Sequence, residues 1–496
     1  MKNKLLLIRV SKSLAYGELD DIYTAKSPCV LTGLLDAYIS QKGIDSEILD
    51  LEVEDFKTKK DLIMEIERRS PSLIGVIASG VNVSASTQSM SAVIDLCKNI
   101  LCEFKEVTKF IYGGHPTALP QRTLLETHAD FILIGEGYET LASILRHMES
   151  SGDKFSVEQL SVFKGVAYLE NNELKLNSQD KLIDVNKLPR INWSKMNPSK
   201  YRAHNWHCFG ENLNNRSPYG VIWTSMGCAY PCEFCCINNL YEKRIFRFRD
   251  MNDVVAEIDE LVKEYKVKNI RIYDELFIMK HPRIEEFVSL LEQRNYDLNF
   301  WCYARPDSVE PKILKKLKGI GVNWIGYGFE AGENTSALKD INKHLKKEWQ
   351  YSNDEVVKMT RDAGINMVGH AILGLWDDDE KSIENNISFL KKHKFEWNNI
   401  YPAFAYPGTP FYKRYISEKI IAEPKSWDEY ALYGKNCKPL PTKHLSSAKV
   451  LELRDNLIKE YYSDPEILED IKIKFGQETV EHIEKMFEVS LVRSIK

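Results

Sequence analysis

The sequence predicts an α/β protein in which a doubly wound parallel sheet is followed by a partial barrel of six strand–helix units and a helical C-terminal region. Three observations predict this fold. Short apolar runs alternate with amphipathic stretches in two separate parts of the chain, its 496 residues exceed what one hydrophobic core usually organises, and the residues after 420 have a helical pattern. We therefore divide the chain into residues 1–150, 151–198, 199–420 and 421–496.

The first part alternates five apolar strand candidates with helical stretches. The strands are expected at residues 5–10, 46–51, 73–79, 109–113 and 131–135, and the helices at residues 30–41, 59–69 and 86–104. Such alternation is typical of a parallel sheet covered on both faces. Ligands of such sheets bind beyond the carboxyl ends of the strands, where this sequence is rich in Gly and Ser.

A connector with one β-hairpin is expected next. Residues 165–169 and 174–176 flank a turn, and Pro189 and Pro198 follow in a strap towards the second alternation.

The second alternation predicts the barrel. Strands are expected at residues 221–225, 269–277, 299–305, 322–329, 366–375 and 399–404, with helices at residues 254–265, 285–292, 354–363 and 380–393. The active site of such a barrel lies at the carboxyl ends of its strands. Helices at residues 446–462 and 478–489 complete the chain.

Composition excludes several classes of function. Apolar residues make up 43% and charged residues 28%, as in ordinary globular proteins. The 67 Lys and Arg residues do not exceed the 72 Asp and Glu residues, so no positive excess supports nucleic-acid binding. The apolar run at residues 5–8 is interrupted by Arg9 and Lys12, so we predict no membrane span and a cytoplasmic location.

Three cysteines form the most specific motif. Cys228, Cys232 and Cys235 have the spacing Cys-x3-Cys-x2-Cys directly after the first barrel strand. Three thiolates can hold three irons of a [4Fe–4S] cluster and leave the fourth iron open for an amine and a carboxylate. The alternative is a zinc knuckle in a zinc-stabilised binding protein, which needs a fourth ligand such as His207, Cys208 or Cys236.

This segment, with Phe234 before the last cysteine, resembles the radical S-adenosylmethionine (SAM) enzymes. The resemblance continues at successive strand ends, in residues 273–277, 304–307, 328–332, 369–375 and 406–410. It implies a [4Fe–4S] cluster on the three cysteines, and SAM bound by side chains at those strand ends. The SAM-binding candidates are Asp274, Glu275, Arg305, Glu330, Ile372 and Gly374.

The first part resembles the cobalamin-binding, Rossmann-like domain that precedes the barrel in one class of these enzymes. Residues 113–117, 124–126 and 129–140 carry the resemblance. The cobalamin-binding candidates that it implies are Ser79, Ser84, Ser86, Thr87, Gly113, Gly114, His115, Gly135, Glu136 and Gly137. Many cobalamin folds place Asp-x-His-x-x-Gly in the first loop, but residues 11–17 contain no His. We therefore expect base-off cobalamin without a protein His ligand, with its tail in the loop of residues 79–87.

Together the resemblances imply methylation of an unactivated carbon of a small metabolite, using methylcobalamin and a 5′-deoxyadenosyl radical. A cyclisation or rearrangement without methyl transfer is the alternative within the same class. The implied partners are a small-molecule substrate and an external electron donor such as flavodoxin or ferredoxin. No side chain is identified as catalytic, because the cofactors supply the reactive groups.

Overall fold

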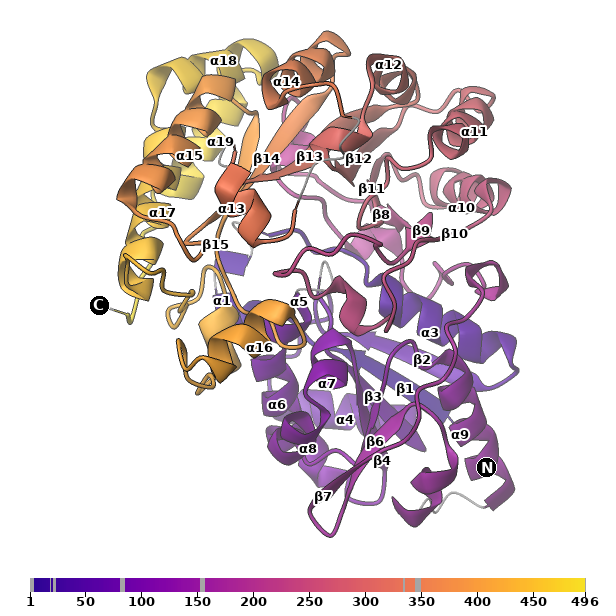
Figure 1. The fold of residues 1–496 in the computed structure, drawn as a ribbon. Coiled ribbons are helices and arrows are strands. Elements are labelled where there is room, and N and C mark those ends of the chain that lie inside the picture. The colour runs from indigo at the N-terminus through magenta and orange to yellow at the C-terminus, as the bar shows by residue number, and fades with distance from the viewer. Residues whose placement is uncertain are drawn as a thin grey trace.

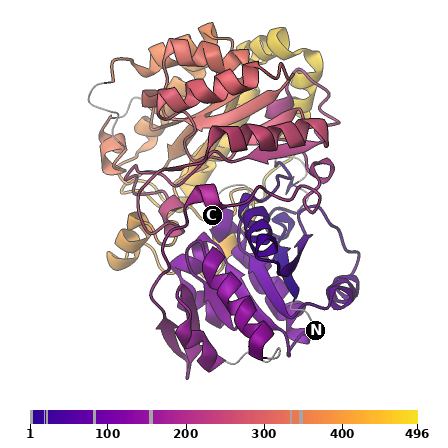
Figure 2. The same ribbon diagram turned by 90° about the vertical axis from the view of Figure 1, so that its right-hand side faces the viewer.

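The computed structural model describes residues 4–17, 19–20, 24–80, 85–151, 157–332, 335–343 and 349–495. Figure 1 shows two sheets one above the other, the lower in indigo and violet and the upper in pink to orange. The C-terminal helices, in yellow, lie beside the upper sheet, and Figure 2 shows the same division from the side. The predicted fold class is confirmed.

The first sheet has the strand order β2-β1-β3-β4-β5-β6-β7, in which β1 to β5 are parallel. Its strands are β1 (Lys4–Arg9), β2 (Asp45–Asp50), β3 (Leu73–Ile77), β4 (Thr108–Tyr112), β5 (Phe131–Leu133), β6 (Val166–Glu170) and β7 (Glu173–Leu176). The helices of this part are α1 (Ser13–Tyr16), α3 (Val30–Gln41), α4 (Lys59–Arg69), α5 (Ala85–Gln88), α6 (Met90–Asn99), α7 (Gly114–Ala118), α8 (Pro120–Thr127) and α9 (Tyr138–Ser151).

The central strand β1 explains why helices cover both faces of this sheet. Leu5 and Leu7 pack in a core with α3 and α9, whereas Leu6 and Ile8 pack in a second core with α4, α6 and α8. Successive side chains of a strand point to opposite faces, so a strand that is apolar at every position needs cover on both.

Two segments of this part differ from the prediction. The hairpin of the connector is present, but β6 pairs antiparallel with β5, so it extends the first sheet instead of linking two domains. The helix expected over residues 86–104 is interrupted between α5 and α6. At the interruption Ser89 Oγ donates to the carbonyl of Ala85, 2.8 Å away, and such side-chain bonds to the backbone compete with a continuous helix.

The second sheet has the order β15-β14-β13-β12-β11-β8 and is parallel throughout. Its strands are β8 (Tyr219–Ile222), β11 (Asn269–Ile272), β12 (Asn299–Ala304), β13 (Val322–Glu330), β14 (Asn366–Leu373) and β15 (Trp397–Pro402), and β9 (Ser225–Met226) and β10 (Arg247–Phe248) form a separate short pair. The helices are α10 (Met251–Lys263), α11 (His281–Glu292), α12 (Pro311–Gly319), α13 (Thr335–Asp340), α14 (Asn353–Asp362), α15 (Glu380–His393) and α16 (Pro410–Ser417). Because β11 ends at Ile272, earlier than predicted, Asp274 and Glu275 lie in the loop beyond it.

The C-terminal helices pack against the barrel. They are α17 (Ser447–Tyr462), α18 (Pro465–Phe475) and α19 (Gln477–Phe487). Tyr461 Oη donates to the carbonyl of Phe395 at 2.8 Å, and the ring of Phe475 stacks on Trp324 with centroids 5.8 Å apart. These helices therefore form part of the barrel core. No helix in the described part of the chain is long and apolar enough to cross a membrane.

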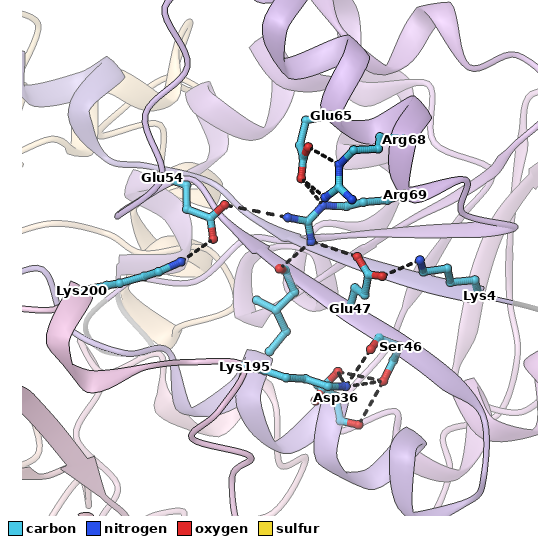
Figure 3. Close-up of polar contacts among 11 residues, drawn as sticks. Lys4, Asp36, Ser46, Glu47, Glu54, Glu65, Arg68, Arg69, Lys195 and Lys200 are labelled. Carbon is cyan, nitrogen blue, oxygen red and sulfur yellow. Dashed lines mark hydrogen bonds and ion pairs between the residues drawn. The ribbon is translucent and has the colours of Figure 1, made fainter. Parts of the chain in front are cut away.

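The strap after the hairpin is fastened to the first domain by ion pairs (Figure 3). Lys195 Nζ lies 2.8 Å from Asp36 Oδ1 and also donates to the carbonyl of Ser46 at 2.7 Å. The Asp36 side chain is 1% exposed, and burial raises its pKa. A buried carboxylate needs a charged partner, so Lys195 holds the strap where it is.

Replacement of Lys195 tests this contact. Lys195→Met leaves Asp36 buried without its partner, and we expect the free energy of unfolding to fall by about 2–4 kcal/mol. The control is Lys200→Met, because Lys200 is half exposed and pairs with Glu54 at 3.3 Å; it should cost less than about 0.5 kcal/mol. Urea unfolding followed by circular dichroism measures both. Equal losses of unfolding free energy in the two variants would contradict the proposed role of Lys195.

Candidate functional site

The three motif cysteines lie on the loop between β9 and the helical turn Ile237–Asn239, at the carboxyl end of the barrel. All three are free, half-buried thiols, and burial raises the pKa of Cys228 to about 11. Gly227 begins the loop with φ +84°, and a Cβ there would lie 2.5 Å from the carbonyl oxygen of Ile245. Burial also raises the pKa of Cys232 and Cys235. A metal binds the thiolate form of cysteine, so its binding releases the thiol protons.

A buried carboxylate holds the base of this loop. Asp274 Oδ1 accepts from the backbone N–H of Thr224 at 2.6 Å, and Oδ2 accepts from the hydroxyls of Thr224 and Ser225, both at 2.5 Å. Arg283 donates to the Thr224 carbonyl at 2.7 Å. Asp274 therefore positions the cysteine loop, and its predicted contact with SAM stays a prediction. Arg283 matches no sequence motif and was not predicted.

Glu275, the next residue, has a different environment. Both of its carboxylate oxygens are buried, and neither has a side-chain hydrogen-bond partner within the part of the chain that the structure describes. Burial, together with the adjacent Asp274 charge, raises the pKa of Glu275 to about 7, against the backbone N–H groups of Glu275 and Gly227, which lower it. An unpartnered buried carboxylate is costly unless a ligand satisfies it. Glu275 therefore fits the ammonium group of SAM.

Two cations lie at the next strand ends. Arg305 is paired with Asp307 through bonds of 2.8 and 3.0 Å, and its guanidinium lies 4.0 Å from the centre of the Tyr230 ring in the cysteine loop. Glu330, at φ +60°, binds Lys343 Nζ at 2.5 Å.

Lys343 Nζ also donates to the carbonyl of Gly328 at 2.7 Å and is 7% exposed. A Cβ at Gly328 would lie 2.6 Å from this nitrogen, so the glycine makes the approach possible. Lys343 was not among the predicted site residues, because it belongs to no strand-end motif of the sequence.

The last two predicted SAM contacts lie on and after β14. Ile372 is buried on the strand. Gly374 has φ +84°, and a Cβ there would lie 2.6 Å from Val450 of α17. The side of Gly374 that would carry a Cβ thus faces helix α17. Gly374 is explained by packing, and its contact with SAM remains a prediction.

Two of the three candidates for the fourth ligand of a zinc site, His207 and Cys208, do not lie near the cysteine loop. His207 Nε2 is bonded to the carbonyl of Asn299, 3.0 Å away, at the first residue of β12. His207 and Cys208 therefore lie at the opposite end of the barrel from the cysteine loop. Within the described residues, no three His, Cys, Asp or Glu side chains are grouped to hold one metal ion. A zinc site would bring its sulfurs to about 3.8 Å from each other, whereas a cluster spreads them over three irons.

The predicted cobalamin residues after β3 and β4 are brought together. The backbone N–H of His115 donates to Ser86 Oγ at 2.9 Å, and His115 Nδ1 lies 3.2 Å from Thr87 Oγ1. Gly113 is required, since a Cβ there would lie 2.3 Å from the carbonyl oxygen of Ala78. Ser79, Gly113 and Gly114 are buried at the same edge, whereas Ser84 lies outside the described residues.

Two buried polar atoms at this edge have no partner in the described structure, Ser79 Oγ and His115 Nε2. The imidazole of His115 packs edge-on against Trp427 with centroids 4.3 Å apart, and burial lowers its pKa to about 3, so it is neutral. Orphaned polar atoms among small residues fit a polar ligand such as cobalamin. The expectation that no His ligates cobalt stays a prediction.

The residues after β5 contact β10 and the connector. Glu136 forms a bidentate ion pair with Arg247 of β10, at 2.7 and 2.9 Å, and accepts from the N–H of Ile183. Gly135 and Gly137 have φ near +68° and shape the turn. Glu136 and Gly137 line a cavity of about 600 Å³ between α3, the start of α9 and residues 179–188. The oxygens of Glu136 fasten β10 to the first domain, and its predicted contact with cobalamin stays a prediction.

The carboxyl ends of the two sheets face each other. Tyr16 Oη, in the loop after β1, donates to Gln88 Oε1 at 3.1 Å. Gln88 Nε2 donates to the hydroxyl of Tyr406, in the loop after β15, at 3.4 Å. The ring of Tyr16 also meets Tyr433 edge-on at 5.7 Å. The cobalamin-type edge and the cysteine end of the barrel thus share one interface.

Two family models match the chain. The model of the radical SAM superfamily matches residues 224–390, and that of the B12 binding domain matches residues 33–145. The chain belongs to the radical SAM superfamily and carries a B12-binding domain. This radical SAM enzyme therefore has a [4Fe–4S] cluster, SAM and cobalamin as its cofactors, which the residues described above fit.

Similar proteins span nearly all of this radical SAM enzyme. The uncharacterized methyltransferase PH0819 of Pyrococcus horikoshii is 24% identical over 427 residues, 86% of this chain and 85% of the relative. The solved radical SAM methyltransferase TsrM of Kitasatospora setae, with tryptophan and a SAM analog bound, is 13% identical with a TM-score of 0.70 and covers 98% and 99% of the two chains. OxsB, a cobalamin-dependent SAM radical enzyme, is 16% identical with a TM-score of 0.69, over 97% and 72%. These structural likenesses establish the fold.

Serine substitutions test the cluster ligands. We expect Cys228→Ser, Cys232→Ser and Cys235→Ser each to abolish the cluster, because each removes a thiolate from one iron. Cys236→Ser is the matched control, since Cys236 is buried beside the motif and should not bind iron. Iron and sulfide analysis of anaerobically reconstituted protein measures this, with about four irons per chain in the control. Loss of iron in Cys236→Ser, or stoichiometric zinc in the wild type, would contradict it.

Glu275→Gln tests the SAM contact. Removing the charge that faces an ammonium should weaken SAM binding by about 10- to 100-fold, without lowering the iron content. Equilibrium dialysis of the reconstituted enzyme with labelled SAM measures the affinity. Glu310→Gln, an exposed carboxylate at the next strand end, is the control. Unchanged affinity in Glu275→Gln would exclude the contact.

Proposed function

We propose that this enzyme methylates an unactivated carbon of a small metabolite. Two of the similar proteins described above are methyltransferases, which supports methyl transfer. The observation that carries the proposal is the interface in which Tyr16 and Gln88 of the first domain contact Tyr406 of the barrel. A methyl donor bound at one edge and a radical formed at the other would meet the same substrate there.

When bound, the cluster and SAM supply a 5′-deoxyadenosyl radical, and cobalamin supplies a methyl group. The residues of the chain hold these groups in place. Asp274 fixes the cysteine loop, Glu275 receives the SAM ammonium group, and Glu330 is held at its strand end by its ion pair with Lys343. Because these groups are already positioned by packing and hydrogen bonds, little reorganisation is needed when the ligands bind.

We further propose that the substrate lies above three rings of the barrel. His370 of β14 lies 5.4 Å from Tyr303 of β12 and 6.1 Å from Tyr401 of β15, measured between ring centroids. Burial lowers the pKa of His370 to about 3, so its imidazole is neutral. A wall of neutral rings excludes water from a radical while leaving hydrogen-bonding atoms for a small polar substrate.

We place the enzyme in the cytoplasm and expect an external one-electron donor. The ten cysteines are all free thiols, which is consistent with a reducing compartment.

Anaerobic turnover with labelled SAM tests the reaction. Candidate metabolites are incubated with the reconstituted enzyme, methylcobalamin and a reductant, and 5′-deoxyadenosine and S-adenosylhomocysteine are measured separately. Radical methylation should give both products together with a methylated substrate. 5′-Deoxyadenosine alone would contradict methylation and indicate cyclisation or rearrangement. The triple variant of the three motif cysteines is the control and should form neither product.

A further inference from the structure

The turn after the cysteine motif carries a buried tyrosine whose hydroxyl has no use within the protein. Tyr241 follows Cys235 closely in the chain and is 1% exposed. Its Oη has no hydrogen-bond partner within the part of the chain that the structure describes. A buried hydroxyl without a partner costs free energy, so one that is held in place here points to a group of a ligand that binds beside it.

Gly227 adjoins both Tyr241 and Glu275. A Cβ on Gly227 would lie 3.5 Å from Cδ2 of Tyr241, so the tyrosine ring packs on this glycine. The backbone N–H of Gly227 faces the Glu275 carboxylate, an interaction that opposes the rise in the pKa of Glu275 caused by burial. The Glu275 charge in turn adds to burial in raising the pKa of Tyr241. The hydroxyl and the carboxylate are therefore neighbours, beside the residue that precedes Cys228.

The position of the tyrosine ring is fixed by the protein. The Arg247 guanidinium lies 5.1 Å from the centre of the Tyr241 ring, and Arg247 is itself bound by both oxygens of Glu136. The backbone N–H of Tyr241 also donates to the carbonyl of Asn238 at 3.2 Å. The hydroxyl is thus held next to Glu275 before a ligand binds, which lowers the cost of ordering the site.

The cations at the neighbouring strand ends already bind acids of the protein. Arg305 is paired with Asp307 through two hydrogen bonds, and Lys343 is paired with Glu330. The Tyr241 hydroxyl, in contrast, carries a hydrogen that no described group accepts. A tyrosine hydroxyl can donate this hydrogen to a carboxylate.

We propose that Tyr241 is a further SAM-binding residue, whose hydroxyl donates to the carboxylate of the cofactor while Glu275 accepts from its amino group. An α-amino acid carries these two groups on one carbon atom, and a hydroxyl donor beside a carboxylate acceptor is complementary to them. The open iron of the cluster binds the same end of SAM, next to the loop that Tyr241 and Glu275 adjoin. The inference rests on the Glu275 contact argued above and does not require methyl transfer.

Tyr241→Phe tests the hydroxyl, because it keeps the ring and its packing on Gly227. Equilibrium dialysis of the anaerobically reconstituted full-length enzyme with labelled SAM should show an affinity about 5- to 20-fold below wild type, with the iron content unchanged. Without SAM the melting temperature should not fall, because the lost hydroxyl has no partner in the described structure. Added SAM should raise the melting temperature less in the variant than in wild type.

Tyr327→Phe is the matched control. Tyr327 is a buried tyrosine of the same barrel, but its hydroxyl is bonded to Thr360 of α14 at 3.0 Å. Its loss should lower the melting temperature and leave the SAM affinity within about twofold of wild type.

Decarboxylated SAM separates the two ends of the contact. It lacks the group that the Tyr241 hydroxyl would meet, so Tyr241→Phe and wild type should bind it equally. A loss with this compound as large as the loss with SAM would overturn the assignment to the carboxylate.

Three other results would overturn the inference. They are a SAM affinity in Tyr241→Phe within about twofold of wild type, an equal loss of affinity in Tyr327→Phe, and an unchanged affinity in Glu275→Gln. Because affinity is measured without turnover, failure of the Tyr241 contact is distinguishable from failure of methylation, which the product analysis decides.

Discussion

The cysteine loop depends on the buried Asp274 carboxylate. It accepts three hydrogen bonds from Thr224 and Ser225, which join the first barrel strand to the loop. A loop that carries three thiols has little apolar surface to keep it in one conformation, so its position must be set at its base. Because Asp274 is fully buried, its charge is compensated only within the protein, by these bonds and by Arg283, whose guanidinium lies 3.8 Å from Oδ2.

An ion pair between Arg247 and Glu136 connects this loop to the first domain. Arg247 lies in β10, which pairs with the strand before Gly227, and its guanidinium is bound by both oxygens of Glu136. Glu136 follows β5, so the turn after that strand and the start of the cysteine loop are held together. The ends of the two sheets also meet through Tyr16, Gln88 and Tyr406. The B12-binding domain and the barrel are therefore held in one arrangement by two sets of contacts, the Arg247–Glu136 ion pair and the Tyr16–Gln88–Tyr406 hydrogen bonds.

Local patterns were sufficient to predict much of this arrangement. The strands of both sheets came from apolar runs separated by helical periodicity, and the cysteine motif came from its spacing. The positions of Glu275 and Arg305 followed from these, because side chains just after parallel strands gather at one edge of a sheet. The protein partners of Asp274 and Glu136 were not predicted, since an acid at a strand end has the same sequence appearance whether it faces a ligand or a buried partner. Their contacts with SAM and cobalamin stay predictions.

The sequence alone was enough to predict the parallel strands of the two sheets, the order of the two domains and the three cysteines, because these depend on periodicity and short spacing along the chain. Only the tertiary structure decided which polar groups remain available to a ligand. Asp274 accepts a hydrogen bond from Thr224 and Glu136 binds Arg247, partners that are 50 and 111 residues away along the chain. Within the described residues the oxygens of Glu275 have no such side-chain partner. Lys343 likewise reaches Glu330 only after the chain has folded. Pairing of buried charges is a property of contacts in space, which no local pattern records.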